Sequence, residues 1–360
     1  MNEIETKLGL IRQLLLSNGL AAVRLRGVDW FAWATGGGSS VIILTDEAGV
    51  AEVLVTAHAA LILTDTIEED RLRAEEVPAE YAVWAAPWSE TQARDSHVRE
   101  LAGAGLIASD RPATGERELP AALVAAKRRL LPEEIERYRR LGAQTSSAVT
   151  EVMTAARPDW TERDLAGAAA EALWARGIDP ALTLTGGERR LPLYGHITPT
   201  AERLGGRAML VVCARGHGLY ANMTRFVQFR APSAEERELS AAVARIESAA
   251  WAASRVGAAL GDTYAEIERA YAAAGWPDAT RRLHQGGTTG YRSREVVARP
   301  GADTRIEANT ALAWNPSLPG VKIEDTILVG ERGLEILTAD PVWPTEQIDG
   351  RARPLALEAF

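Results

Sequence analysis

An abrupt change of sequence pattern about one third of the way along the chain is the strongest constraint on the fold. An alanine-rich stretch ends in the basic run 127–129, and a charged helical pattern begins at 132–134 with proline and two glutamates. Proline and acidic residues are favoured in the first turn of a helix. The 360 residues therefore divide into segments of ordinary domain size. We expect two domains, 1–126 and 127–345, and a C-terminal tail, 346–360.

The first segment alternates helical and strand patterns. A helical stripe over 7–19 ends at Asn18-Gly19, and apolar runs typical of strands follow. These strand candidates cover residues 21–25, 41–45, 50–56 and 105–110. The runs 41–45 and 50–56 flank a turn-forming stretch and predict a hairpin. This order is typical of an α/β domain.

The second segment begins with two helices and continues with strands. Thr161 and Asp164 have the spacing of a helix cap, so one helix should start directly after Thr161. The predicted helices are 133–156, 162–176, 234–257 and 262–275. A loop is predicted over 178–200, a strand pair over 208–213 and 218–229, and a β-rich region over 283–338. The fold class is therefore α/β, of the α+β kind.

Charge and cysteine content exclude several classes of protein. The chain has 40 basic and 49 acidic residues, a net charge of −9, which argues against nucleic acid as the main ligand. A single cysteine, Cys213, excludes an intramolecular disulfide and a multi-cysteine metal site. No apolar run is long enough to span a membrane, and the N-terminus lacks the pattern of a signal peptide. We expect a cytoplasmic protein that binds neither membranes nor nucleic acids.

Polar residues gather in four otherwise apolar segments, 191–200, 218–226, 283–295 and 322–329. They hold a histidine ahead of a strand, a Gly-x-Tyr-x-Asx-x-Thr-Arg strand, a His-x-Gly-Gly element and a closing Ile-Glu-Asp-Thr. In this order the motifs resemble the creatinase, prolidase and methionine aminopeptidase superfamily (M24). The resemblance covers roughly 130–340 and implies a "pita-bread" catalytic domain. The first lobe is similar to the N-terminal domain of creatinase and prolidase.

Peptidases of this family hold two divalent metals with two Asp, one His and two Glu. The resemblance places the two Asp positions at Val211 and Asn222, the His at His284 and the Glu positions at Asn315 and Glu324. Only one of these side chains is a carboxylate, whereas hard divalent ions need several. We therefore expect no catalytic metal, or at most one that binds weakly, and no other cofactor.

Creatinase is a member of the family that uses no metal, and the resemblance implies a similar reaction here. Its acid/base histidine corresponds to His196, and imidazole can donate and accept a proton near neutrality. Tyr291 stands seven positions after His284, where peptidases have a second catalytic histidine. We expect His196, His284, Tyr291 and Glu324 to be the catalytic residues. Gly286 and Gly287 predict a backbone that approaches a ligand closely in a pocket wall.

Arginines are the candidates for binding an anionic group, because a guanidinium matches a carboxylate. The candidates for this role are Arg225, Arg294 and Arg190, and Arg225 is equally suited to a buried pair with Glu324 or Asp325. The expected substrate-binding residues are Tyr220, Asn222, Thr224, Arg225, Arg294 and Asn315. Cys213 and the pair Trp30 and Trp33 are expected to be core residues.

The leading hypothesis is a metal-independent hydrolase that cleaves a carbon–nitrogen bond of a small polar molecule. One alternative is a metallopeptidase similar to Xaa-Pro aminopeptidase with a degenerate metal site. Another is a noncatalytic pita-bread module that binds a partner, since fold does not settle function. The resemblance also implies a homodimer. The substrate itself is not encoded in any recognisable motif.

Overall fold

The computed structural model describes residues 2–360, which divide into two compact units, 2–134 and 135–360. The division lies later than the predicted boundary after residue 126. Lys127 is buried in the first unit and its Nζ lies 2.5 Å from Asp29 Oδ2, and Glu134 pairs with Lys7 at 2.7 Å. These ion pairs attach the basic run to the first unit. Within residues 2–360, no helix combines the length and apolar character needed to cross a bilayer.

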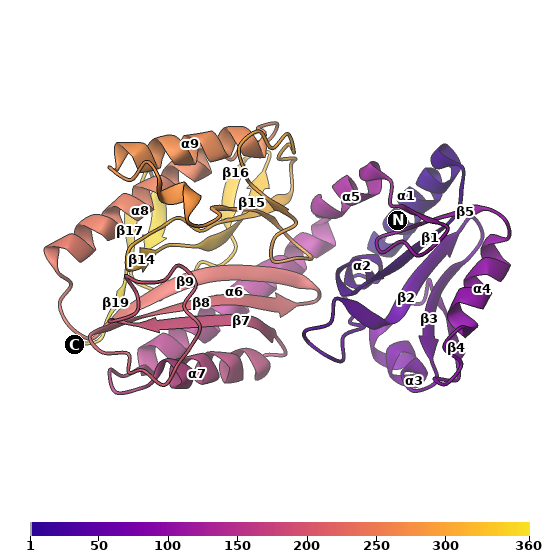
Figure 1. Ribbon diagram of the computed structural model, residues 1–360, viewed down its shortest axis with the longest axis horizontal. Coiled ribbons are helices and arrows are strands. Elements are labelled where there is room, and N and C mark those ends of the chain that lie inside the picture. Colours follow the sequence, from indigo (N-terminus) through magenta and orange to yellow (C-terminus); the bar gives the residue numbers. More distant parts are fainter. Residues whose placement is uncertain (1) are drawn as a thin grey trace. The chain divides into compact units, whose positions relative to one another are not determined.

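The first unit is built on a six-stranded mixed sheet of order β4-β3-β2-β1-β5-β6. Its elements are α1 (Glu3–Asn18), β1 (Leu20–Gly27), α2 (Val28–Ala34), β2 (Ala48–Thr56), β3 (Ala60–Asp65), α3 (Glu69–Arg71), the π-helical turn η1 (Leu72–Glu76), β4 (Ala82–Ala86), α4 (Ala93–Ala102), β5 (Leu106–Ser109), β6 (Glu116–Glu118) and α5 (Ala121–Arg128). Helix α4 covers one face of the sheet, and α1 and α2 lie on the other (Figure 1). Trp30 and Trp33 are buried, as expected of core residues.

The hairpin predicted over 41–45 and 50–56 is wrong. Residues 41–45 form a loop in which Ile42, Ile43 and Leu44 are about half exposed, and β2 instead pairs with β3 on one side and β1 on the other. Both edges of β2 are therefore occupied, so the apolar run 41–45 cannot pair with β2 as a hairpin partner. Strand propensity depends on tertiary context, and a local apolar run does not by itself determine a strand.

The second unit contains the remaining elements of the chain. They are α6 (Pro132–Ala155), α7 (Glu162–Trp174), β7 (Asp179–Gly187), β8 (Arg207–Gly216), β9 (Leu219–Gln228), α8 (Ala234–Ala253), α9 (Leu260–Ala273), η2 (Ala279–Arg281), β10 (Gly286–Thr289), β11 (Val296–Val297), β12 (Thr310–Trp314), β13 (Ser317–Leu318), β14 (Val321–Lys322), β15 (Asp325–Gly330), β16 (Gly333–Ile336), β17 (Thr345–Ile348), β18 (Arg351–Pro354) and β19 (Leu357–Glu358). The helices and the strand pair β8–β9 confirm the predicted order. The predicted loop 178–200 is wrong in its first half, which forms strand β7.

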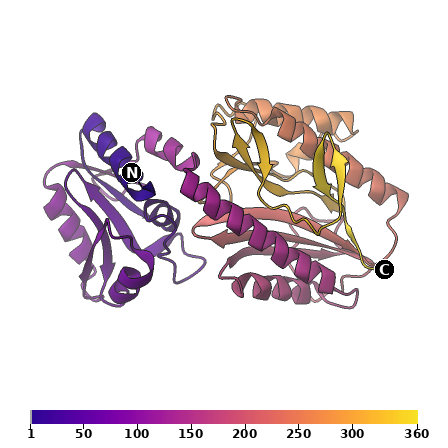
Figure 2. The ribbon, with the colours of Figure 1, turned by 180° about the vertical axis from the view of Figure 1, so that it is seen from behind.

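Two sheets form the centre of the second unit, and each is covered by a pair of helices (Figures 1 and 2). The four-stranded sheet has the order β19-β9-β8-β7, with α6 and α7 on its outer side. The five-stranded sheet has the order β11-β10-β12-β15-β16, with α8 and α9 packed over it. Thr161 and Asp164 form the predicted capping box at the start of α7.

The sheets meet along β9 and the start of β15. Thr224 N donates to Glu324 O at 3.0 Å, Tyr220 N donates to Gly290 O at 2.8 Å, and Asn222 N donates to Thr326 Oγ1 at 2.7 Å. These bonds satisfy one edge of β9. The junction therefore fixes the side chains of β9 against those of β15.

The segment predicted as a C-terminal tail is part of the second unit. Strands β17 and β18 form a hairpin, and β19 pairs in parallel with β9. Arg353 in β18 is buried, and its guanidinium pairs with Glu247 of α8 and with Asp325 at 2.9 Å. Its guanidinium carbon lies 4.0 Å from the centroid of the Trp251 ring. The last residues thus connect α8 to the junction of the sheets.

We predict that Arg353→Ala lowers the free energy of unfolding by about 3–5 kcal/mol, because it leaves the buried Glu247 without its cation and Asp325 with Arg225 alone. Chemical denaturation of the full chain measures this loss. Arg351→Ala is the control, since Arg351 lies in the same strand but is not buried, and it should change stability by less than about 0.5 kcal/mol. Equal stability of the two variants would contradict the ionic role of Arg353.

Candidate active site

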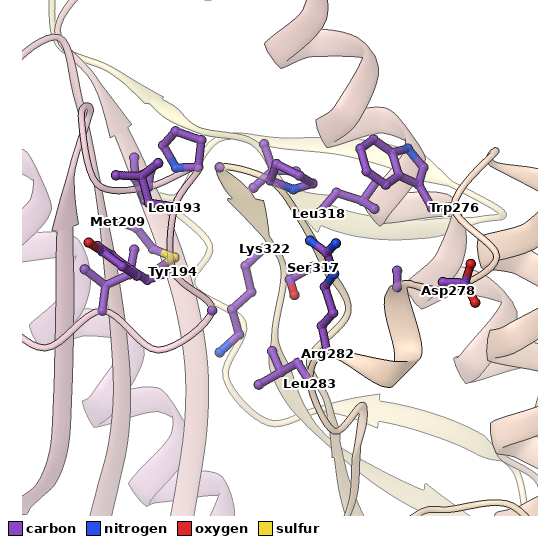
Figure 3. A pocket seen from close by; sticks show the side chains of 18 of the residues that line it. Leu193, Tyr194, Met209, Trp276, Asp278, Arg282, Leu283, Ser317, Leu318 and Lys322 are labelled. Carbon is purple, nitrogen blue, oxygen red and sulfur yellow. The ribbon is translucent and has the colours of Figure 1, made fainter.

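A cavity of about 390 Å³ opens in the second unit between three segments. One is the loop 191–197 that precedes β8, the second is 275–283 between α9 and β10, and the third is the hairpin of β13 and β14. Figure 3 shows Leu193, Tyr194 and Met209 on one side and Trp276 on the other. The cavity lies where the predicted polar segments 191–200 and 283–295 approach each other.

Lys322 connects this cavity to a buried carboxylate. Its side chain lines the cavity, and its Nζ lies 2.9 Å from Glu324 Oε2. Arg294 Nη2 lies 2.6 Å from the other oxygen, Oε1, and Thr224 Oγ1 donates to Oε2 at 3.1 Å. Burial alone would raise the pKa of Glu324, but the two cations outweigh it and lower that pKa to about 2. Glu324 is therefore ionised and held by three donors.

Asn222 belongs to a buried hydrogen-bond network beside this carboxylate. Thr289 Oγ1 donates to Arg292 O, so its oxygen accepts from Asn222 Nδ2 at 3.0 Å. This orients the amide, and Asn222 Oδ1 has no hydrogen-bond partner within residues 2–360. The same holds for Asn315 Oδ1, which is also buried. Two amide acceptors are thus able to bind N–H donors.

The two predicted histidines lie close together next to the cavity. His196 stands between the wall residues Gly195 and Ile197, and His284 follows the wall residue Leu283. The ring centroids are 6.1 Å apart, and both side chains are exposed. Partial desolvation, reinforced by the Lys322 ammonium, lowers the pKa of His196, while desolvation and Arg294 lower the pKa of His284 to about 4. Both imidazoles are neutral bases at neutral pH.

Other residues predicted for the site are buried or engaged in contacts within the fold and do not line this cavity. Arg225 pairs with Asp325 at 2.7 Å, and Arg190 pairs with Glu162, so neither guanidinium faces the cavity as a free anion site. Tyr291 is fully buried, with 1% of its surface exposed. Tyr220 is half-buried, and its carbonyl accepts from Tyr138. Cys213 is half-buried, and desolvation raises the pKa of its thiol to about 11, so it is not an activated nucleophile.

Gly286 and Gly287 are needed for strand packing, which corrects the prediction that they line a pocket. Both have positive φ angles, and a Cβ on either would lie 2.0 Å from a carbonyl oxygen, that of Ala313 or of Val296. The close approach that these glycines permit is therefore to the neighbouring strands β12 and β11.

The residues at the family's metal positions do not fit a two-metal centre. Val211 and the two asparagines supply no negative charge, and Glu324 is already paired with Lys322 and Arg294. Among residues 2–360, no three His, Cys, Asp or Glu side chains are grouped as a metal site requires. Two cations around one carboxylate leave a net positive charge, which disfavours a divalent ion.

Sequence analysis missed two residues of this site, Lys322 and Arg282. Lys322 and Glu324 are two positions apart in an extended segment, so their side chains share a face. That spacing was a usable signal for the ion pair. Arg282 lines the cavity from a turn after η2, and no local pattern distinguishes it from other surface arginines.

We predict that Lys322→Met lowers the free energy of unfolding by about 3 kcal/mol, because one of two counter-cations of a buried carboxylate is lost. Adding Glu324→Gln should restore much of that stability, since the uncompensated charge is then removed. A double-mutant cycle measured by chemical denaturation gives the coupling between the two side chains. A coupling near zero would show that Lys322 does not hold Glu324.

Solved structures with similar folds match both units. The prolidase from Pyrococcus horikoshii OT3 is 17% identical, with a TM-score of 0.78 over 93% of this chain and 98% of that one. The X-Pro aminopeptidase from Thermotoga maritima MSB8 is 18% identical, with a TM-score of 0.76 over 98% and 99%. The N-terminal domain of FACT complex subunit SPT16 from Cicer arietinum is 14% identical, with a TM-score of 0.70 over 94% and 96%.

These likenesses establish the fold as an N-terminal α/β domain followed by a pita-bread domain. No curated relative matches the chain. The sequence profile of metallopeptidase family M24 matches residues 136–331, more than half of the chain. The protein is therefore a member of the M24 family.

Proposed function

We propose that this chain is a metal-independent hydrolase that cleaves a carbon–nitrogen bond of a small polar molecule, with His196 as the general acid/base. The observation that carries the proposal is an exposed, neutral imidazole pair beside a cavity whose wall includes Lys322. General acid/base catalysis requires a group that both accepts and returns a proton, and neutral imidazole does so near pH 7.

The proposed reaction uses two side chains, those of His196 and Lys322. His196 takes a proton from water, and the water oxygen forms a bond to the carbon of the scissile C–N group. The negative charge that develops on that carbon's oxygen or nitrogen substituent faces the Lys322 ammonium, which has donors beyond the one used by Glu324. The C–N bond then breaks, and the leaving nitrogen receives the proton from His196.

The buried amide oxygens would suit a substrate rich in N–H groups that reaches beyond the cavity wall, since neither asparagine lines the cavity. Asn222 Oδ1 and Asn315 Oδ1 occupy positions where peptidases of the family have carboxylate ligands, and both lack hydrogen-bond partners within residues 2–360. A neutral amide oxygen accepts a hydrogen bond from an amide, amidine or guanidine without adding charge. This supports a C–N substrate of that kind over a metal-bound peptide.

A noncatalytic binding module is the second candidate. Glu324 is fully engaged by two cations and Tyr291 is buried, so of the four predicted catalytic residues only the two histidines are left for proton transfer beside the cavity. A cluster with so few reactive groups suits binding of an anionic partner as well as catalysis. Binding without any turnover favours this candidate.

The test is a turnover assay with amidino, guanidino, lactam, N-acyl and N-carbamoyl compounds, and with Gly-Pro, in buffer containing EDTA. Product amines are followed by NMR. We predict that at least one non-dipeptide compound is hydrolysed, and that His196→Ala lowers kcat/KM by about 100-fold or more.

His217→Ala is the matched control. His217 is exposed in the turn between β8 and β9 and is not a wall residue of the cavity, so this variant should keep full activity. Equal activity of wild type and His196→Ala would overturn the role of His196. Hydrolysis of Gly-Pro alone, and only after addition of Mn²⁺, would favour a metallopeptidase instead.

A further inference from the structure

We propose that the cavity beside His196 binds small carboxylates that carry a bulky apolar group, and that Arg282 holds the carboxylate. The binding claim stands on the cavity itself, and the claim that such a molecule is the substrate rests on the function proposed above. No residue at the family's metal positions takes part in it.

The cavity walls are mainly apolar. The large apolar and aromatic side chains that line it are Leu191, Leu193, Tyr194, Met209, Trp276 and Leu318. Its volume of about 390 Å³ lies within the range of sites that hold small organic molecules. Desolvation of an aromatic or branched aliphatic group against such walls is favourable by about 25 cal/mol for each Å² buried. The body of the ligand is therefore apolar.

The charge that faces this apolar space is positive. Three charged residues line the cavity, and two of them have ionic partners: Lys322 pairs with Glu324 at 2.9 Å, and Asp278 with Arg281 at 3.5 Å. Arg282 has no ion-pair partner within the part of the chain that the structure describes. Its guanidinium is therefore available for an incoming anion.

The charged groups of Arg282 and Lys322 lie apart, so an elongated ligand would bind in one orientation. In Figure 3, the guanidinium of Arg282 points up and the ammonium of Lys322 points down, so the two charged ends face in opposite directions. Lys322 points to the cluster with Glu324, which lies near His196 and contributes to the charge around it. A carboxylate on Arg282 would leave the other end of an elongated ligand directed to the Lys322 and His196 end.

A planar carboxylate is the anion that best fits an exposed guanidinium beside apolar walls. Arginine binds carboxylate through two parallel hydrogen bonds, and these are stronger than bonds between neutral groups. A neutral amide of the same shape keeps the apolar contacts but loses the ionic ones. Comparing the acid and the amide of one compound therefore separates the ionic contribution to binding from the apolar contribution.

The experiment measures binding of 4-phenylbutyrate, 4-phenylbutanamide and acetate to the full chain by calorimetry. We expect the acid to bind about tenfold or more tightly than the amide, because of the charge-assisted bonds. Acetate should show no measurable binding, because it lacks the apolar body. Arg282→Gln should reduce the preference for the acid to less than about threefold and leave the amide unchanged.

Arg299→Gln is the control, because Arg299 is exposed, does not line the cavity and pairs with no residue of its wall. It should bind the acid as wild type does. Equal affinity for acid and amide in the wild type, no binding of the acid, or equal loss in both variants would overturn the proposal.

Repeating the measurement with His196→Ala separates this proposal from the proposed function. Retained acid preference in that variant, with no turnover of any compound by the wild type, would support the carboxylate site and refute the hydrolase. Turnover that depends on His196, without any preference for the acid, would support the hydrolase and refute the carboxylate site.

Discussion

Two adjacent carboxylates, Glu324 and Asp325, hold the centre of the second unit together. Each is buried, and each is neutralised by two basic side chains: Lys322 and Arg294 at Glu324, and Arg225 and Arg353 at Asp325. A buried carboxylate without a partner is costly, so these four cations stabilise the folded second unit. They come from β9, β14, β18 and the loop after β10, and therefore fix these elements around the start of β15.

The two cations bound to Glu324, Lys322 and Arg294, also determine what chemistry the site supports. The resemblance places the divalent-ion ligands of M24 peptidases in this region, whereas here a lysine and an arginine supply the positive charge around the remaining carboxylate. The architecture of the family is retained although the donor set is not. A fixed ammonium cannot activate water as a metal ion does. In the proposed reaction, proton transfer therefore falls to His196, which lies beside His284, and lowered pKa values keep both imidazoles neutral.

Sequence patterns predicted most of the second unit because its helices and strands have strong local signals. Thr161 and Asp164 cap a helix wherever that helix packs, and the strand pair β8–β9 is set by a turn between apolar runs. The run 41–45 shows the opposite case, since its predicted partner β2 pairs with β1 and β3 instead, and the run forms a loop despite its strand propensity. Arg294 and Glu324 lie 30 positions apart, so only the fold could reveal their contact.

The most direct test of this account is a crystal structure grown with millimolar Mn²⁺ and measured at an energy where manganese scatters anomalously. We predict that Lys322 Nζ stays within hydrogen-bond distance of Glu324, with no anomalous peak beside it, because the positive charge of the cluster repels a divalent ion. An anomalous peak between His284 and Glu324, with Lys322 displaced from the carboxylate, would contradict the account.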